Sequence, residues 1–169
     1  ERYVDSMSSL RRLEDAQPQY EELQLQEFLS ALTESAALLC AQSNKKLTVH
    51  NQTMVTYTIL DRSFVTQVCH NLLSNALRYA ADTVTLAFGE DDRGFWLSVA
   101  DDGSGFTEDT LTKATTPYFT AEKDHALHFG LGLYICKLLC EHHGGSFTLE
   151  NLARGAKGTA FFKTPSPPD

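Results

Sequence analysis

Apolar residues recur at intervals of three and four along four stretches of the chain, the pattern of a helix that buries one face. The longest stretch begins after Asp61, whose carboxylate suits an N-cap, and continues to about Ala81. Within it Val68, Leu72 and Ala76 fall on one side, where they would face a core. The other predicted helices cover residues 1–14, 26–42 and 131–143.

Other short segments alternate apolar and polar residues, as half-buried strands do. Leu23 and Leu25 indicate a short edge strand, and Gly155 and Gly158 indicate a turn between the last two strands. Residues 103–129 show no sustained period and predict a loop. The remaining strands are predicted near residues 46–50, 54–59, 83–88, 94–101, 146–151 and 158–163. This order predicts the α+β class: a two-layer α/β sandwich in which a mixed sheet of about five strands packs on three helices.

The chain has 169 residues, with 14 Lys and Arg against 22 Asp and Glu, which gives a net charge of −8. An acidic chain without a basic stripe argues against nucleic acid as a partner. Its apolar runs are shorter than the roughly 18 residues that a membrane-spanning helix needs, and we expect no direct membrane contact. The chain begins without an initiator Met or a signal peptide, so we expect it to be a piece of a longer protein.

The four cysteines lie in apolar, helix-like contexts and are expected to be buried thiols in a reducing cytosol. Cys136 and Cys140 are followed closely by His142 and His143. These residues offer a metal only a pair on one helix face, whereas structural zinc takes four ligands in a closed spacing. We therefore expect no zinc site.

The predicted helix after Asp61 carries a polar stripe opposite its apolar one. Gln67, Asn71, Asn75 and Arg78 follow one another at spacings of four, four and three, so they share one face. Two asparagine carbonyl oxygens one turn apart can coordinate Mg²⁺, and Arg78 adds a positive charge one turn further along the helix. A solvated polar face is the simpler alternative.

A carboxylate ends the predicted strand 94–101, and two glycines follow it. In the segment Asp101-Asp102-Gly103-Ser104-Gly105 the glycines would let the backbone turn sharply and approach a flat ligand. A buried Asp101 can accept a hydrogen bond from an exocyclic amine such as adenine N6. An ordinary Asp-Gly turn is the alternative.

Two more glycines open the predicted helix 131–143. The segment Gly130-Leu131-Gly132-Leu133 would leave backbone N–H groups free at the helix N-terminus, where an anion is favoured. The segment is neither a Walker A motif nor a dinucleotide fingerprint. A phosphate cradle of this kind needs no net positive charge, which suits an acidic chain.

Taken in this order, the motifs resemble the ATP-binding catalytic domain of bacterial two-component sensor histidine kinases, within the GHKL superfamily. Residues 70–79 are similar to the N box of that family, 101–105 to its G1 box, 117–120 to its F box and 130–133 to its G2 box. The resemblance covers about residues 20–164. It implies the Bergerat fold, with ATP bound on the helical side of the sheet.

The resemblance also implies roles for single residues. Asp101 would read adenine, Asn75 would hold Mg²⁺, and Asn71 would assist the metal or place the phosphates; Asn71, Asn75 and Arg78 are the expected catalytic residues. Further contacts to ATP are expected from Tyr79, Gly103, Gly105, Phe119, Lys123, Gly130, Leu131, Gly132, Leu133 and Thr159. Residues 107–129 would form a lid over ATP.

The chain departs from the family pattern beside the G2 box. Many members have a further glycine where this chain has His128, and a small residue where it has Phe129. The hinge of the lid is therefore expected to be stiffer here than in those members.

In function, the resemblance implies a protein-histidine kinase domain that positions Mg·ATP for transfer to a histidine, and from there to an aspartate of a response regulator. Residues 1–17 would be the end of a dimerisation-domain helix with its linker, 18–164 the ATP-binding domain and 165–169 a disordered tail. None of the six histidines has an acceptor context. We expect a monomeric fragment that is inactive without the acceptor domain, taken from a homodimeric parent. It would be cytoplasmic, with the parent anchored in the plasma membrane.

Three alternatives share the fold or the motifs. A GHKL ATPase of the gyrase, chaperone or mismatch-repair kind would carry an acidic general base near the position of Asn71. An anti-sigma-factor serine kinase would lack the helix predicted at residues 1–14. A degenerate nucleotide-binding scaffold would not need Asn75, Asp101 and the glycines. His70, beside Asn71, lies off the polar stripe, so we expect it to pack or face solvent.

Overall fold

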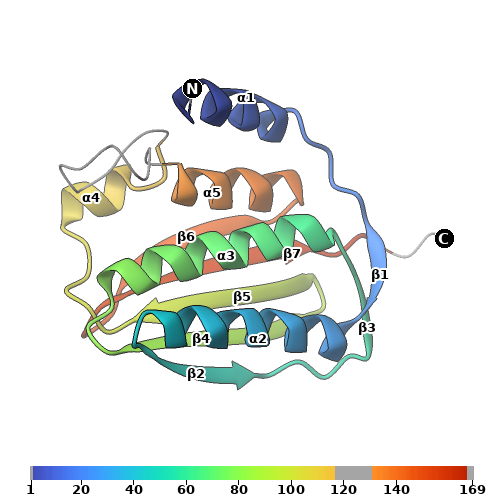
Figure 1. The fold of residues 1–169 in the computed structure, drawn as a ribbon. Helices are drawn as coiled ribbons and strands as arrows, with labels where there is room; N and C mark the ends of the chain where they lie inside the picture. The colour runs from blue at the N-terminus through green and yellow to red at the C-terminus, as the bar shows by residue number, and fades with distance from the viewer. Residues whose placement is uncertain (1, 117–130, 167–169) are drawn as a thin grey trace.

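The computed structural model describes residues 2–116 and 131–166, with side chains from residue 8 onward. Its main feature is a five-stranded sheet in which only the β2–β4 pair is parallel (Figure 1). A separate antiparallel pair joins β1 (Glu21–Gln24) and β3 (Tyr57–Leu60). The strands of the sheet lie in the order β2 (Lys46–Asn51), β4 (Thr83–Asp91), β5 (Gly94–Asp101), β7 (Ala156–Lys163) and β6 (Ser146–Asn151).

Three helices cover one face of this sheet, as Figure 1 shows: α2 (Leu25–Gln42), α3 (Arg62–Tyr79) and α5 (Gly132–His142). The predicted class is therefore confirmed: a mixed five-stranded sheet packed on three helices. Two further helices, α1 (Arg2–Glu14) and α4 (Glu108–Lys113), lie outside this layer. Among the described helices, none has the length and apolar character that crossing a membrane requires.

The core lies between the sheet and the three helices. Phe95, Leu97 and Val99 of the central strand β5 are buried at every second position, so that side of the strand faces the helices. All four cysteines are buried free thiols, as expected, and burial raises the pKa of Cys69 to about 12. The central helix α3 buries Phe64, Val65, Val68, Cys69, Leu72, Leu73 and Ala76.

Buried polar groups fix the start of α3. Asp61 is 3% exposed and caps the helix, since Oδ1 accepts from the N–H of Phe64 at 2.9 Å and Oδ2 accepts from that of Gln19 at 2.7 Å. The backbone N–H of Asp61 donates to Nε2 of His143 at 3.0 Å, and Nδ1 of that ring lies 3.0 Å from the carbonyl oxygen of Lys163. These bonds require a neutral imidazole, and burial lowers the pKa of His143.

Three sequence predictions need correction. Leu25 begins α2 rather than extending the edge strand, because the side chain of Gln24 caps the N–H of Glu27 at 2.7 Å. Gly158 lies inside β7 rather than in the turn; a Cβ there would come within 2.7 Å of Leu72 Cδ2, so the glycine lets α3 approach the sheet. The predicted loop 103–129 contains α4, because Thr107 Oγ1 caps the N–H of Thr110 at 3.1 Å.

The N-terminal helix α1 packs on the outer side of α5 (Figure 1). Leu10 is buried, and Tyr134 Oη donates a hydrogen bond to Glu14 at 3.3 Å. The predicted tail 165–169 lies in part outside the described residues, which end at Ser166.

Candidate nucleotide site

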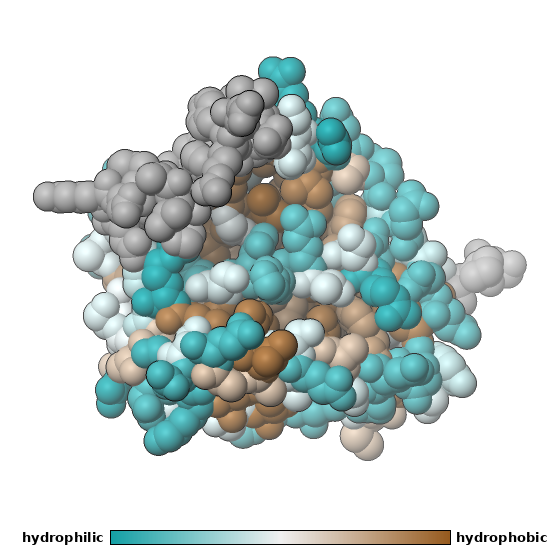
Figure 2. Space-filling model, viewed as in Figure 1, coloured by the Kyte–Doolittle hydropathy of each residue, from teal (hydrophilic) through white to brown (hydrophobic). Residues whose placement is uncertain are grey.

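The polar stripe of α3 forms one side of the site. Gln67, Asn71, Asn75 and Arg78 are all half-buried, while the residues between them, apart from the half-buried Leu77, are buried in the core or exposed. Asn71 Nδ2 donates a long hydrogen bond, 3.4 Å, to the carbonyl oxygen of Gly132. Hydrophilic side chains accordingly run across the middle of the face drawn in Figure 2, over α3.

The start of α5 forms a second side. Leu131 stands at the N-cap position, where no side chain caps the helix, so its first N–H groups are left to other partners. Leu131 and Leu133 are nearly buried, which holds the backbone at this point. An added Cβ at Gly132 would meet nothing within 4 Å. Within the described part of the chain, the first turn of α5 therefore has space beside Gly132 and backbone N–H groups that no side chain caps, an arrangement that suits an anion.

The end of β5 supplies a buried carboxylate. Asp101 is 8% exposed, and its Oδ1 accepts a hydrogen bond from the N–H of Gly103 at 2.8 Å. Burial raises its pKa above the usual 3.8, and the neighbouring charge of Asp102 acts in the same direction, while the N–H groups of Gly103 and Ala156 oppose it. A partly desolvated acceptor of this kind suits an amine donor of a ligand.

The next residue, Asp102, has a role that sequence reasoning missed. Its Oδ1 accepts from three successive backbone N–H groups, those of Ala81 and Asp82 at 2.9 Å and of Thr83 at 3.1 Å. These bonds lower the pKa of Asp102. The residue therefore joins the end of β5 to the chain that leaves α3; the available signal was an acid directly after Asp101, but its partners lie about 20 residues away.

The C-terminal end of α3 is held from two more directions. Lys45 Nζ donates to the carbonyl oxygens of Ala80 at 2.8 Å and Ala81 at 2.9 Å. Gly103 lies directly against the carbonyl oxygen of Tyr79, where any Cβ would collide. Gly103 is thus needed for the close packing of the end of β5 against the end of α3, a region that we call the corner. This need is separate from any approach of the backbone to a ligand.

The structure brings together most of the predicted site residues that it describes, on α3, at the end of β5 and at the start of α5. Thr159 is not among them: it alternates with the core residues Gly158 and Ala160 and so lies on the opposite face of the sheet. Its predicted contact with ATP has no support in this geometry. Phe119, Lys123 and Gly130 lie outside the described residues, as do His128 and Phe129 and the part of the predicted lid from residue 117 onward.

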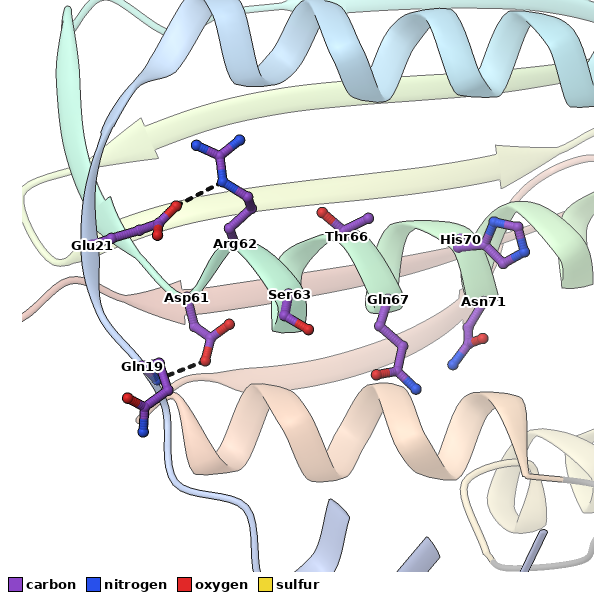
Figure 3. Close-up of a pocket in the computed structure, with 9 residues that line it drawn as sticks. All are labelled: Gln19, Glu21, Asp61, Arg62, Ser63, Thr66, Gln67, His70 and Asn71. Carbon is purple, nitrogen blue, oxygen red and sulfur yellow. Dashed lines mark hydrogen bonds and ion pairs between the residues drawn. The ribbon is translucent and has the colours of Figure 1, made fainter. Parts of the chain in front are cut away.

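An open pocket of about 760 Å³ adjoins the site along the outward face of α3 (Figure 3). It extends from Asn71 toward the start of the helix, away from Asp101, and the exposed His70 lines it, in agreement with a surface role. An ion pair of 2.6 Å joins Arg62 and Glu21 at its rim. The full lining is Gln19, Glu21, Asp61, Arg62, Ser63, Thr66, Gln67, His70 and Asn71.

Comparison with known proteins identifies the family. The family model described as "Histidine kinase-, DNA gyrase B-, and HSP90-like ATPase" matches residues 60–168, more than half of the chain. The chain belongs to this ATPase family. The match contains α3, the end of β5 and the start of α5, which are the three elements of the site.

The similar proteins are sensor kinases. The chain is 27% identical to histidine kinase P4 of Formosa agariphila, over 94% of this chain and 12% of that protein. It is also 27% identical to the sensor histidine kinase SpaK of Bacillus subtilis, over 92% of this chain and 35% of that one. The chain thus spans between about a tenth and a third of these relatives. Full-length ShkA in complex with AMPPNP shares the fold, with a TM-score of 0.75 and 22% identity over 93% of this chain and 34% of ShkA.

Alanine at two glycines separates folding from binding in this domain. Gly132→Ala should leave the free energy of unfolding nearly unchanged, because its Cβ enters open space and alanine favours a helix. It should weaken ATP binding, because that space borders the free N–H groups of α5. Gly103→Ala, the matched comparison, should destabilise the fold by about 1–3 kcal/mol through its collision with Tyr79.

Urea unfolding and calorimetric ATP titration measure the two effects. An unfolding loss at Gly132→Ala as large as that at Gly103→Ala would contradict the placement of open space at the start of α5.

Proposed function

We propose that this chain is the catalytic ATP-binding domain of a sensor histidine kinase. The proposal rests on one observation above all: α3, which carries the amide stripe, contacts the chain beside the buried acceptor Asp101 at its C-terminal end and the uncapped start of α5 through Asn71. The sensor kinases among its relatives support the proposal, as does full-length ShkA, which contains a domain of this fold and forms a complex with the ATP analogue AMPPNP.

Each element would take one part of the nucleotide. Asp101 would accept a hydrogen bond from adenine N6, with Gly103 and Gly105 close to the base. The N–H groups at Gly132 and the guanidinium of Arg78 would face the phosphates. Asn75, assisted by Asn71, would hold Mg²⁺, which neutralises charge on the phosphates. Tyr79, Leu131 and Leu133 would line the site, joined by Phe119, Lys123 and Gly130.

The transfer step requires a partner. Phosphoryl transfer needs the nucleophile in line with the γ-phosphate, so the domain mainly positions groups and compensates charge. The acceptor histidine would lie on a dimerisation domain of the parent homodimer, with α1 and the linker up to residue 17 as its last part. A response-regulator aspartate would receive the phosphoryl group afterwards, in the cytoplasm, from a parent anchored in the plasma membrane.

Activation of water, as in ATPases of the same family, is less well supported by the residues present. The stripe of α3 offers amides and one cation at its half-buried positions, Gln67, Asn71, Asn75 and Arg78, and no carboxylate. An amide cannot act as a general base for water. These residues fit transfer to a positioned acceptor better than hydrolysis.

Replacing the base-reading acid tests the adenine contact. Asp101→Asn should weaken ATP binding by about tenfold to a hundredfold, the scale of about 1.5–3 kcal/mol for a lost hydrogen bond to a charged group. The fold should persist, since the amide oxygen can still accept from Gly103. Calorimetric titration measures the affinity, and equal affinities for the variant and the wild type would refute the assignment of Asp101.

Removal of the metal tests the proposed role of Asn75. Asn75→Ala should lower ATP affinity roughly tenfold in Mg²⁺ and leave it nearly unchanged in EDTA, because the lost ligand acts through the ion. Gln67→Ala, one stripe position beyond Asn71, is the matched control and should have no such effect. Equal losses of Asn75→Ala in both conditions would mean that the residue is structural.

Transfer in trans tests the kinase function itself. Incubated alone with radiolabelled ATP, this chain should incorporate no acid-labile phosphate, because its histidines lack an acceptor context. Addition of the helical dimerisation domain of the full-length protein should give slow labelling of that domain. Strong acid-labile, base-stable label on this chain alone would show that one of its own six histidines is an acceptor.

A further inference from the structure

The turn between β6 and β7, residues 151–155, contacts residues 101–106 at the end of β5 through Asn151, Arg154 and Gly155. Asn151, the last residue of β6, makes two hydrogen bonds to the backbone of Phe106: Oδ1 accepts from its N–H at 2.8 Å, and Nδ2 donates to its carbonyl oxygen at 2.7 Å. One side chain thus satisfies both backbone groups of the residue that follows Gly105.

The same turn also contacts two residues that precede Phe106 in this segment, Asp102 and Asp101. Arg154 Nε donates to the carbonyl oxygen of Asp102 at 3.0 Å. Gly155, with φ of +85°, lies directly against the carbonyl oxygen of Asp101, where a Cβ would collide. The turn is itself closed by a 3.0 Å bond from the N–H of Leu152 to the carbonyl oxygen of Gly155. It therefore forms a small platform that contacts residues 101, 102 and 106.

Asn151 acts where the corner has most freedom. Gly105 has φ of +76°, a conformation with little steric resistance to change in a glycine. A Cβ at Gly105 would lie 3.0 Å from Asn151 Oδ1, so the amide packs against this backbone as well as bonding to the next residue. We call the two hydrogen bonds from Asn151 to Phe106 the clamp. Among the described contacts, no other group bonds to the backbone of Phe106.

We infer that Asn151 is a positioning residue for nucleotide binding: it holds Gly105 and Phe106 in the conformation that the base requires, without touching the nucleotide. This inference rests on the proposed function. Because the clamp is exposed to solvent, its loss should cost little folding free energy, since water can replace both bonds. The cost appears instead on binding, when the freed backbone has to be ordered again.

The test compares Asn151→Ala with Leu152→Ala, a neighbouring substitution in the same turn whose side chain is 38% exposed. We expect Asn151→Ala to weaken ATP binding by roughly threefold to thirtyfold, the scale of one to two hydrogen bonds, and Leu152→Ala to leave it unchanged. The urea midpoint of both variants should stay close to that of the wild type. The loss should be the same in Mg²⁺ and in EDTA, because the clamp acts on the base side of the site.

Three results would overturn the inference. Unchanged ATP affinity in Asn151→Ala would show that the clamp has no bearing on the site. A fall in the urea midpoint that accounts for the weaker binding would make Asn151 merely structural, and a loss confined to Mg²⁺ would place its effect on the metal side. Failure of the wild type to bind ATP is a separate outcome, which overturns the proposed function and this inference with it.

Discussion

The proposed nucleotide site depends on how the end of α3 meets the end of β5. Asp102 takes the N–H groups of residues 81–83, while Lys45 takes the carbonyl oxygens of Ala80 and Ala81. A carboxylate thus binds the N–H groups, and an ammonium group the carbonyl oxygens, of the same short segment, residues 80–83. Because Gly103 has no side chain, the carbonyl oxygen of Tyr79 can lie directly against it. Any shift of α3 along its axis would break these contacts together, so the spacing between its amide stripe and Asp101 is fixed.

The electrostatics of the corner explain how an acidic chain can serve an anionic ligand. The pKa values of two adjacent carboxyl groups shift in opposite directions: backbone N–H groups lower the pKa of Asp102, whereas burial raises that of Asp101. The charge of Asp102 is therefore compensated by the fold, and Asp101 is the acceptor that we propose for a base. In the proposed site, the N–H groups at the start of α5 and Arg78 would bind the phosphates locally, so a net charge of −8 is compatible with an anionic ligand.

Sequence patterns predicted the fold class, the three core helices and the residues of the α3 stripe, because each depends on a local period or on a motif. They failed where distant segments meet. Asp102 and Asn151 each bond to backbone groups that no spacing reveals. Resemblance also did not reveal that Thr159 lies on the face of the sheet opposite the helices, since one residue of register in β7 decides which face it occupies. The helix α4 follows from the cap at Thr107, a signal that was present but lay in a segment without a period.

A second polar network fixes the first half of α3, at the opposite end of the helix from the contacts of Asp102 and Lys45. Asp61 joins the linker at Gln19 to the first turn of α3, and His143 joins that turn to the ends of α5 and β7. The imidazole accepts at one nitrogen, so a lowered pKa favours the form that the network requires. Both ends of α3 are thus held by buried or backbone-bonded polar groups, and its apolar side is held by the sheet. Among the described residues, the amide stripe makes one long bond of its own, from Asn71, so the contacts that position it come from outside the stripe.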